Sequence, residues 1–403
     1  LPWLLIGIAV LLIFRTRVAS SRAMIALAMG PVLIALVFAC GQLRWCNQLD
    51  AGLIALLVAI TSAINATVIA RRWWWSFVAT VLLLPGLLQL APPVRTAARH
   101  ELSEVDVESL VERDLAHWLA QRTNGTALVL ASPDLTASLC YHGGLRGLGT
   151  LDRENKDGLM ATVMITRATS PDEALALIQK RGITHIVIPS WANMLNKYAT
   201  GLSQSTGSFI DVLNRWESLV WLRPVPYHLP RIGGFEGQFV AVFEVVDEQD
   251  KADALSGLAE YFVEMGQIEQ AAGMLGELNQ FPRNLSAMVA LAQIESARGD
   301  ATALAGVYNL VVGELSRGAD HALPWDRRVS LAGVLAQGNR LDLAREQTRR
   351  CFAEIDEVKL RSLSAGALFR LEAVGRKLGM EIADNRLRAL GRSLLPPGAR
   401  SRF

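Results

Sequence analysis

Long apolar runs crowd the first 91 of the 403 residues and are nearly absent from the rest. Four of them stand out, at residues 1–14, 25–40, 52–70 and 77–91. A helix needs about 20 apolar residues to cross the roughly 30 Å hydrocarbon core of a bilayer. The first run is too short for this, and flanking residues can extend the others. The pattern therefore predicts about four transmembrane helices over residues 1–91, the first one truncated, with more of the protein expected upstream.

The charges between these runs predict their orientation. Arginines occupy the first connection (residues 15–22) and the third (Arg71-Arg72), whereas the second holds one arginine and one aspartate. Because cytoplasmic loops are enriched in Lys and Arg, the first and third connections are expected in the cytoplasm. The last run then leaves the membrane near Pro92-Pro93 on the opposite side. The competing interpretation is that these runs form the buried helical core of a soluble protein.

Charge and cysteine content exclude several functions. A net charge of +2 does not support a nucleic-acid partner, which would need a clustered basic face. No Cys-x-x-Cys pair or His-x-x-x-His spacing indicates a metal site. We therefore expect no metal ligand in this chain and structural roles for its four cysteines, Cys40, Cys46, Cys140 and Cys351.

Residues 92–250 combine signals for helices and strands. Apolar residues at helical spacing predict a helix over 102–120, and Ser170-Pro171-Asp172-Glu173 is typical of a helix start. Short apolar runs predict buried strands, at 127–131, 184–189, 219–222 and 239–246, and a turn at Ser132-Pro133-Asp134 is expected to close the first of them. Strands separated by helices argue for an extracytoplasmic α/β domain.

Three residues of this region are candidates for facing an acceptor or ligand: His142, Glu154 and Asn155. Glu154 and Asn155 belong to the polar cluster 152–157, which is either a solvated loop with a helix cap or a ligand-facing loop. His142 stands before glycines that form neither a dinucleotide fingerprint nor a P-loop. His142, His185 and His228 could serve as acids or bases, but no nucleophile motif stands beside any of them, so structural roles are favoured for all three. No catalytic residue is assigned.

Residues 251–397 show a glycine and alanine pattern with a period near 34. Gly266, Gly299 and Gly338 are each followed six residues later by an alanine, at 272, 305 and 344. Small residues at these places would let paired helices approach closely around a glycine turn. The pattern resembles tetratricopeptide repeats over about 252–355, which implies a helical solenoid that docks a protein partner. An irregular helical bundle is the alternative.

The order of membrane helices, extracytoplasmic α/β domain and helical tail resembles the C-terminal half of bacterial polytopic GT-C-type glycosyltransferases. Five short elements carry the local likeness: Ser132-Pro133-Asp134, Gly149-Thr150-Leu151, Glu154-Asn155, Gly158-Leu159 and Arg181 to Val187. The resemblance implies the bacterial inner membrane, residues after about 92 in the periplasm, a polyprenyl-phosphate sugar donor and often a divalent metal. The catalytic carboxylate of that group lies in the first external loop, for which this chain has no matching position.

The sequence therefore leaves two main functional hypotheses. In the first, the chain is the C-terminal part of a membrane glycosyltransferase-like protein whose catalytic residues lie upstream. In the second, it is a non-enzymatic membrane-anchored scaffold whose repeats bind an envelope protein. A transporter is a weaker third hypothesis, because no charged residue lies within the predicted spans, and such residues mark translocation paths.

Overall fold

The computed structural model describes residues 2–16, 18–41, 46–65, 103–200, 207–230, 232–233, 235–380 and 385–394. The apolar run predicted at 77–91 lies outside these residues. Contacts divide the chain into two compact units, Leu1–Leu102 and Ser103–Phe403, and each is considered by itself.

The described residues of the first unit form three apolar helices, α1 (Pro2–Arg15), α2 (Ala19–Gly41) and α3 (Cys46–Asn65). In the described part of the chain, one helical stretch is long and apolar enough to cross a membrane, Ala19–Ala39 in α2, with a mean hydropathy of 2.1. The apolar parts of α1 and α3 are shorter than a span. Ile25 and Leu56 are fully buried in a core shared by the three helices, whereas Leu27 is 80% exposed.

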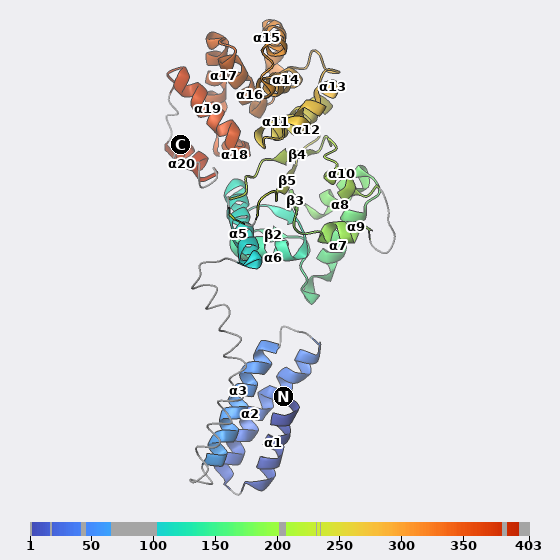
Figure 1. Ribbon diagram of the computed structural model, residues 1–403, viewed down its shortest axis with the longest axis vertical. Helices are drawn as coiled ribbons and strands as arrows, with labels where there is room; N and C mark the ends of the chain where they lie inside the picture. The colour runs from blue at the N-terminus through green and yellow to red at the C-terminus, as the bar shows by residue number, and fades with distance from the viewer. Residues whose placement is uncertain are drawn as a thin grey trace. The chain divides into compact units, whose positions relative to one another are not determined.

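The second unit is built around a five-stranded mixed sheet with the order β2-β1-β3-β5-β4 (Figure 1). Its strands are β1 (Leu128–Leu130), β2 (Arg146–Gly147), β3 (His185–Pro189), β4 (Leu222–Val225) and β5 (Val240–Val245). Strand β1 pairs in parallel with β2 and β3, whereas β5 runs antiparallel to β3 and β4. The two outer strands, β2 and β4, give the sheet two distinct edges.

Helices cover both faces of this sheet. One face packs against α5 (Glu104–Thr123) and α6 (Pro133–Gly143), whose leucines meet Val129, Val187 and Val242. The other face packs against α7 (Lys156–Arg167), α8 (Pro171–Arg181) and the short α10 (Phe209–Asn214). The 3₁₀ helix η3 (Arg153–Asn155) precedes α7, and α9 (Met194–Thr200) packs on α7.

Two sequence expectations in this region need correction. The run at 219–222 is only the approach to β4, which starts at Leu222. Ser132-Pro133-Asp134 does not close a turn but starts α6, because proline at the first helical position already has the required φ and lacks an N–H that would go unpaired. The helix that we predicted from 102 to 120 is α5, and the strands predicted near 127, 184 and 239 are β1, β3 and β5.

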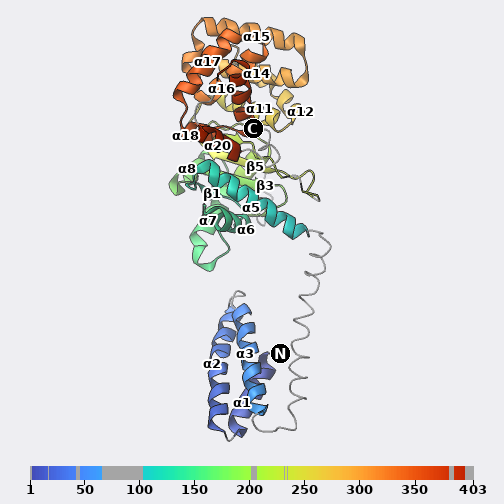
Figure 2. The same cartoon turned by 90° about the vertical axis from the view of Figure 1, so that its left-hand side faces the viewer.

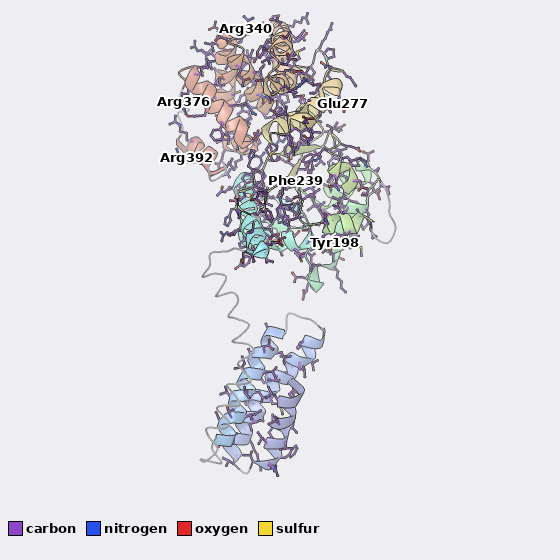
Figure 3. All side chains as sticks on the ribbon, viewed as in Figure 1. Tyr198, Phe239, Glu277, Arg340, Arg376 and Arg392 are labelled. Atoms are coloured by element: carbon purple, nitrogen blue, oxygen red, sulfur yellow. The ribbon has the colours of Figure 1, made fainter. Side chains whose placement is uncertain are left out.

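The rest of the second unit is helical. Its elements are α11 (Lys251–Glu264), α12 (Ile268–Gly273), α13 (Leu275–Leu278), α14 (Leu285–Arg298), α15 (Ala301–Ser316), η4 (Ala319–Ala322), α16 (Trp325–Gln337), α17 (Leu341–Glu354), α18 (Glu357–Ser362), α19 (Ala365–Lys377) and α20 (Asn385–Leu394). Helices α11, α14, α16 and α19 pack on one another in that order. We call residues 251–394 the helical region. Its outer surface carries exposed charges such as Glu277, Arg340 and Arg376 (Figure 3).

The repeated glycines lie in turns between these helices, with one difference. Gly266 and Gly299 adopt left-handed conformations, with φ of 74° and 77°. In the third turn Gly338 has a φ of −73°, and Asn339 takes the left-handed position with a φ of 55°. The side chain of Tyr308 packs against Gly338, where a Cβ would lie 3.2 Å from the ring.

The alanines that we expected between paired helices do not behave alike. Ala344 is fully buried, and so are Ala259 and Ala292 seven residues before the first two glycines. Ala305 is exposed, because α15 turns Leu304, Val307 and Tyr308 toward the core instead. The expectation of a close helix approach at Ala305 is therefore wrong.

Candidate functional site

A row of polar side chains crosses three strands at the end of the sheet where the parallel strands begin. The register pairs His185 of β3 with Glu244 of β5, and Glu244 with Arg223 of β4. Residues paired in this way project from the same face of a sheet. Arg223 Nη2 donates to Glu244 Oε2 at 2.8 Å. The strands therefore hold an imidazole, a carboxylate and a guanidinium side by side.

Helix α5 adds a second guanidinium to this row. Arg122, in its last turn, is buried, and its Nη2 lies 3.7 Å from Glu244 Oε2. The same guanidinium donates to the carbonyl oxygens of Ser362 and Leu363 at 2.5 and 2.7 Å. Arg122 thus joins the sheet to the segment between α18 and α19.

Burial and neighbouring charges set the protonation states of the row. Burial alone would raise the pKa of Glu244, but the charges of Arg223 and Arg122 outweigh it and hold the pKa at about 2. Burial lowers the pKa of His185 to about 4, although Glu244 opposes the change. Burial also lowers the pKa of Arg122 to about 10. At neutral pH the row therefore holds two cations, one anion and a neutral imidazole.

The charges continue from the sheet into the helical region. Arg223 Nη1 lies 3.5 Å from Asp326 Oδ2, and Arg327 Nη1 binds Glu260 Oε2 at 2.5 Å. Arg327 reaches Glu260 across α11 at Gly257, where a Cβ would stand 2.7 Å from its Nη2. The side chain of Arg327 is only 7% exposed, so a carboxylate partner is needed to offset its loss of hydration.

The carboxylate of Glu264 accepts hydrogen bonds at the N-terminus of α19. Glu264 Oε2 accepts from the Ser364 hydroxyl at 2.6 Å, and its Oε1 accepts from the Gly366 backbone N–H at 2.8 Å. A negative charge at this position is favoured by the helix dipole. A Cβ at Gly366 would lie 2.5 Å from the Glu264 carboxylate, so a larger residue there would displace that carboxylate.

A cavity of about 570 Å³ opens beside the row. Its polar lining includes Arg122, Thr126, His185, Glu244 and Arg361, and its apolar lining includes Val245 and Val358. The guanidinium of Arg361 is engaged by Glu357 and by the Gln121 carbonyl oxygen. Because the cations already have partners, the cavity suits a neutral polar molecule with hydroxyl groups better than an additional anion. We treat this cavity as the candidate functional site.

The structure places the three candidate residues from the sequence away from this cavity's lining. His142 lies near the end of α6, where its ring contacts those of Tyr141 and His117. Glu154 is exposed in η3. Asn155 Nδ2 donates to the Leu148 carbonyl oxygen at 3.1 Å and lies 3.3 Å from Thr150 Oγ1, so its amide shapes the turn after β2.

Sequence reasoning missed the arginines and the carboxylate of the row. One signal was present: Glu244 interrupts an otherwise apolar strand. A charged residue in such a strand loses hydration and therefore needs a partner of opposite charge. The partners Arg122 and Arg223 are 122 and 21 residues away and carried no local motif. His185 was noticed and interpreted as structural.

Within the described residues, no group of three or more His, Cys, Asp or Glu side chains could hold a metal ion. Cys351 is a buried free thiol whose pKa burial raises to about 12, and Cys140 is a half-buried free thiol. Neither has the lowered pKa that marks a reactive cysteine. Comparison with models of protein families, with curated proteins and with solved structures finds no match for this chain.

Proposed function

We propose that this chain is the C-terminal part of a membrane glycosyltransferase-like protein that takes a sugar from a polyprenyl-phosphate donor on the periplasmic side. In this proposal residues 1–91 anchor the protein in the bacterial inner membrane. The α/β layer contributes to holding the acceptor, and the catalytic carboxylate, with any divalent metal, belongs to a membrane loop N-terminal to Leu1. The helical region is a solenoid that closes one edge of the sheet.

The observation that carries the proposal is the exposed apolar surface of α2. Only 17% of the most apolar window in Ala19–Ala39 is buried, and Leu27 and Val37 are 80% and 72% exposed. Water disfavours such a surface, at about 25 cal/mol for each Å² of apolar area, whereas lipid accepts it. The anchor is therefore the best-supported part of the proposal.

Three of the elements that carry the family resemblance pack together around the turn after β2: Gly149-Thr150-Leu151, Glu154-Asn155 and Gly158-Leu159. A Cβ at Gly158 would overlap the Leu148 carbonyl oxygen and Asn155 Oδ1, and one at Gly149 would lie 2.5 Å from Thr162 Oγ1. These glycines are thus fixed by close packing around the turn after β2. This packing gives Asn155 a structural part in the turn.

Photoaffinity labelling in membranes tests this proposal. Membranes that contain the protein would be irradiated with a photoreactive short-chain polyprenyl-phosphate sugar, with unlabelled donor and free polyprenol as competitors. We expect labelling of this polypeptide that the unlabelled donor abolishes and the free polyprenol does not. Labelling no stronger than that of an unrelated membrane protein would contradict the proposal.

The topology has a separate test. Glu217 is exposed, and its side chain pairs with Arg215 at the surface, so Glu217→Cys offers an accessible thiol on the second unit. In intact spheroplasts a membrane-impermeant maleimide should label this variant without permeabilisation. Labelling only after permeabilisation would place residues after 92 in the cytoplasm and exclude periplasmic transfer.

One observation favours the scaffold as a second candidate. Helix α15 has no charged residue from position 301 to 313, and Leu310 on it is 56% exposed. An uncharged outer helix surface is typical of protein contacts. In this alternative Leu310→Arg releases a protein partner from the full chain, whereas the surface variant Val105→Arg, at a position that is 70% exposed, retains it. Equal capture of partners by both variants would contradict the scaffold.

A further inference from the structure

Large apolar side chains stand exposed around the β2 edge of the sheet. Four of them lie between positions 141 and 164, and we call them the β2-edge patch: Tyr141 (85% exposed), Leu151 (62%), Met160 (59%) and Met164 (51%). Single exposed apolar residues are normal, but several around one edge strand mark an interaction surface.

The patch is held on both sides of the edge strand. Tyr141 belongs to the last turns of α6, which packs so closely on β2 that a Cβ at Gly147 would overlap the Thr136 side chain. Met160 and Met164 are four residues apart on α7 and therefore share one helix face. Helix α7 in turn packs on Gly149, just after β2.

The two basic side chains of α7 suit a lipid surface. Lys156 and Arg167 are exposed at the two ends of the helix and bracket the two methionines, with the exposed Asp157 beside Lys156. Long basic side chains can keep their charge among headgroups while their stems cover apolar surface. Tyrosine is enriched at the membrane interface because its ring is apolar and its hydroxyl polar.

The chain enters the second unit at the start of α5, away from the contact between Arg122 and the helical region. Arg122 near the end of α5 contacts the helical region, and the start of this 20-residue helix lies about 30 Å from Arg122. Figures 1 and 2 show α6 and α7 on the side of the sheet opposite the helical region. The last apolar run of the sequence ends at Ala91, and residues 92–102 can span at most about 40 Å before α5 begins.

We infer that the β2-edge patch is a membrane-contact surface that rests on the headgroup and upper acyl region of the bilayer. The inference depends on the proposed membrane anchor and adds a second contact with the same lipid. Such a contact fixes the orientation of the sheet, so that the cavity beside Arg122 and His185 keeps a constant height above the bilayer.

Fluorescence quenching by lipid nitroxides tests the inference on the full chain in nanodiscs. With the four native cysteines replaced by alanine, a bimane label is attached after Met160→Cys or Met164→Cys. Two exposed apolar positions of the same unit are the matched negative controls, Leu310→Cys and Val358→Cys, which are 56% and 77% exposed. Leu27→Cys on α2 is the positive control for the anchor.

We expect nitroxide lipids to quench the labels at 160, 164 and 27 and to leave those at 310 and 358 bright. Quenching at 27 without quenching at 160 and 164 overturns the inference and leaves the anchor intact. A blue shift at 160 and 164 without quenching means that protein, not lipid, covers the patch, which also overturns it. Absence of quenching at 27 removes the proposed anchor and the inference together.

Discussion

The two edges of the same sheet differ in which side chains they bury and which they expose. At the β4 edge, charged residues are buried or partly buried and the helical region covers them. At the β2 edge, apolar side chains are exposed and the described residues leave them uncovered. Arg122, Arg223 and Glu244 each make more than one polar contact. Met160 and Leu151 are 59% and 62% exposed.

An aromatic cluster reinforces the closure of the β4 edge. Trp216 packs on Phe243 of the sheet and on Tyr261 and Phe262 of α11, with ring centroids 4.9 to 5.4 Å apart. It does so from a left-handed backbone conformation, with a φ of 55°, which costs a bulky residue of the order of 1 kcal/mol or more. The strain is tolerated because the packing around it fixes the position.

Comparison of the two edges separates residues whose role is to stabilise the fold from residues whose presence the fold does not explain. Folding accounts for the buried ion pairs, since each charge at the β4 edge offsets the desolvation of another. Folding does not account for exposed methionines and a tyrosine at the β2 edge. Substitutions at the first edge should therefore lower stability, and those at the second should change contacts with other molecules.

The largest effect is expected from Glu244→Ala. Removal of the carboxylate leaves Arg122 and Arg223 close together and without their shared anion, which should cost about 3–5 kcal/mol of unfolding free energy. Denaturant unfolding of the full chain in detergent, followed by the near-ultraviolet signal of the tryptophans, measures the loss. The control is Glu217→Ala, whose pair with Arg215 is exposed and should contribute at most about 1 kcal/mol. Equal losses for the two variants would contradict the assigned role of the row.

A smaller effect is expected from pH through His185. Its pKa is about 4 in the fold and 6.5 as the reference value, so acid protonates the unfolded chain first. Stability should therefore fall by about 3 kcal/mol as the pH drops from 6.5 to 4. Glu244, with a pKa lowered to about 2 from 4.5, extends the loss below pH 4.5. His185→Gln should flatten the dependence between pH 6.5 and 4 in denaturant titrations, and an unchanged slope would show that other groups cause it.

Part of this fold could be predicted from short stretches of the sequence. The N-cap of α8 was recognisable because Ser170 accepts from the Glu173 backbone N–H and Pro171 starts the helix. Strand β3 was recognisable because His185 to Pro189 is short, apolar and buried throughout. Strand β2 could not be recognised, since two residues, Arg146 and Gly147, give no periodicity.

The candidate site could not be derived from the sequence for a different reason. Its charges are brought together by the register of the strands and by the position of the end of α5. Neither of these can be recognised from a short stretch of sequence. The likeness around Glu154 and Asn155 was visible as a motif, but motif residues can serve packing as readily as ligands. The third glycine turn is another case in which a motif residue lacks the expected role, because Asn339 and not Gly338 adopts the left-handed conformation.

Gly158→Ala tests whether the β2 edge also contains a tightly packed position. The new methyl group would overlap the Leu148 carbonyl oxygen and Asn155 Oδ1, so we expect a loss of about 1–3 kcal/mol. Gly306→Ala in α15 is the matched control, because no atom lies within 4 Å of its Cβ position. There the better helix propensity of alanine should raise stability by up to about 1 kcal/mol. A neutral Gly158→Ala would mean that the turn after β2 adjusts freely.

The smallest effect on stability is expected at the β2-edge patch. Met160→Ser removes a side chain that is already 59% exposed, so the unfolding free energy of the detergent-solubilised chain should change by less than about 0.5 kcal/mol. In bilayers the same variant should reduce lipid quenching of a label placed after Leu151→Cys, because the patch loses apolar area. A control is Met288→Ser in α14, which is 2% exposed and should cost several times more stability without altering the quenching. If Met160→Ser lowers stability as strongly as Met288→Ser, the methionine serves the fold and the contrast between the two edges disappears.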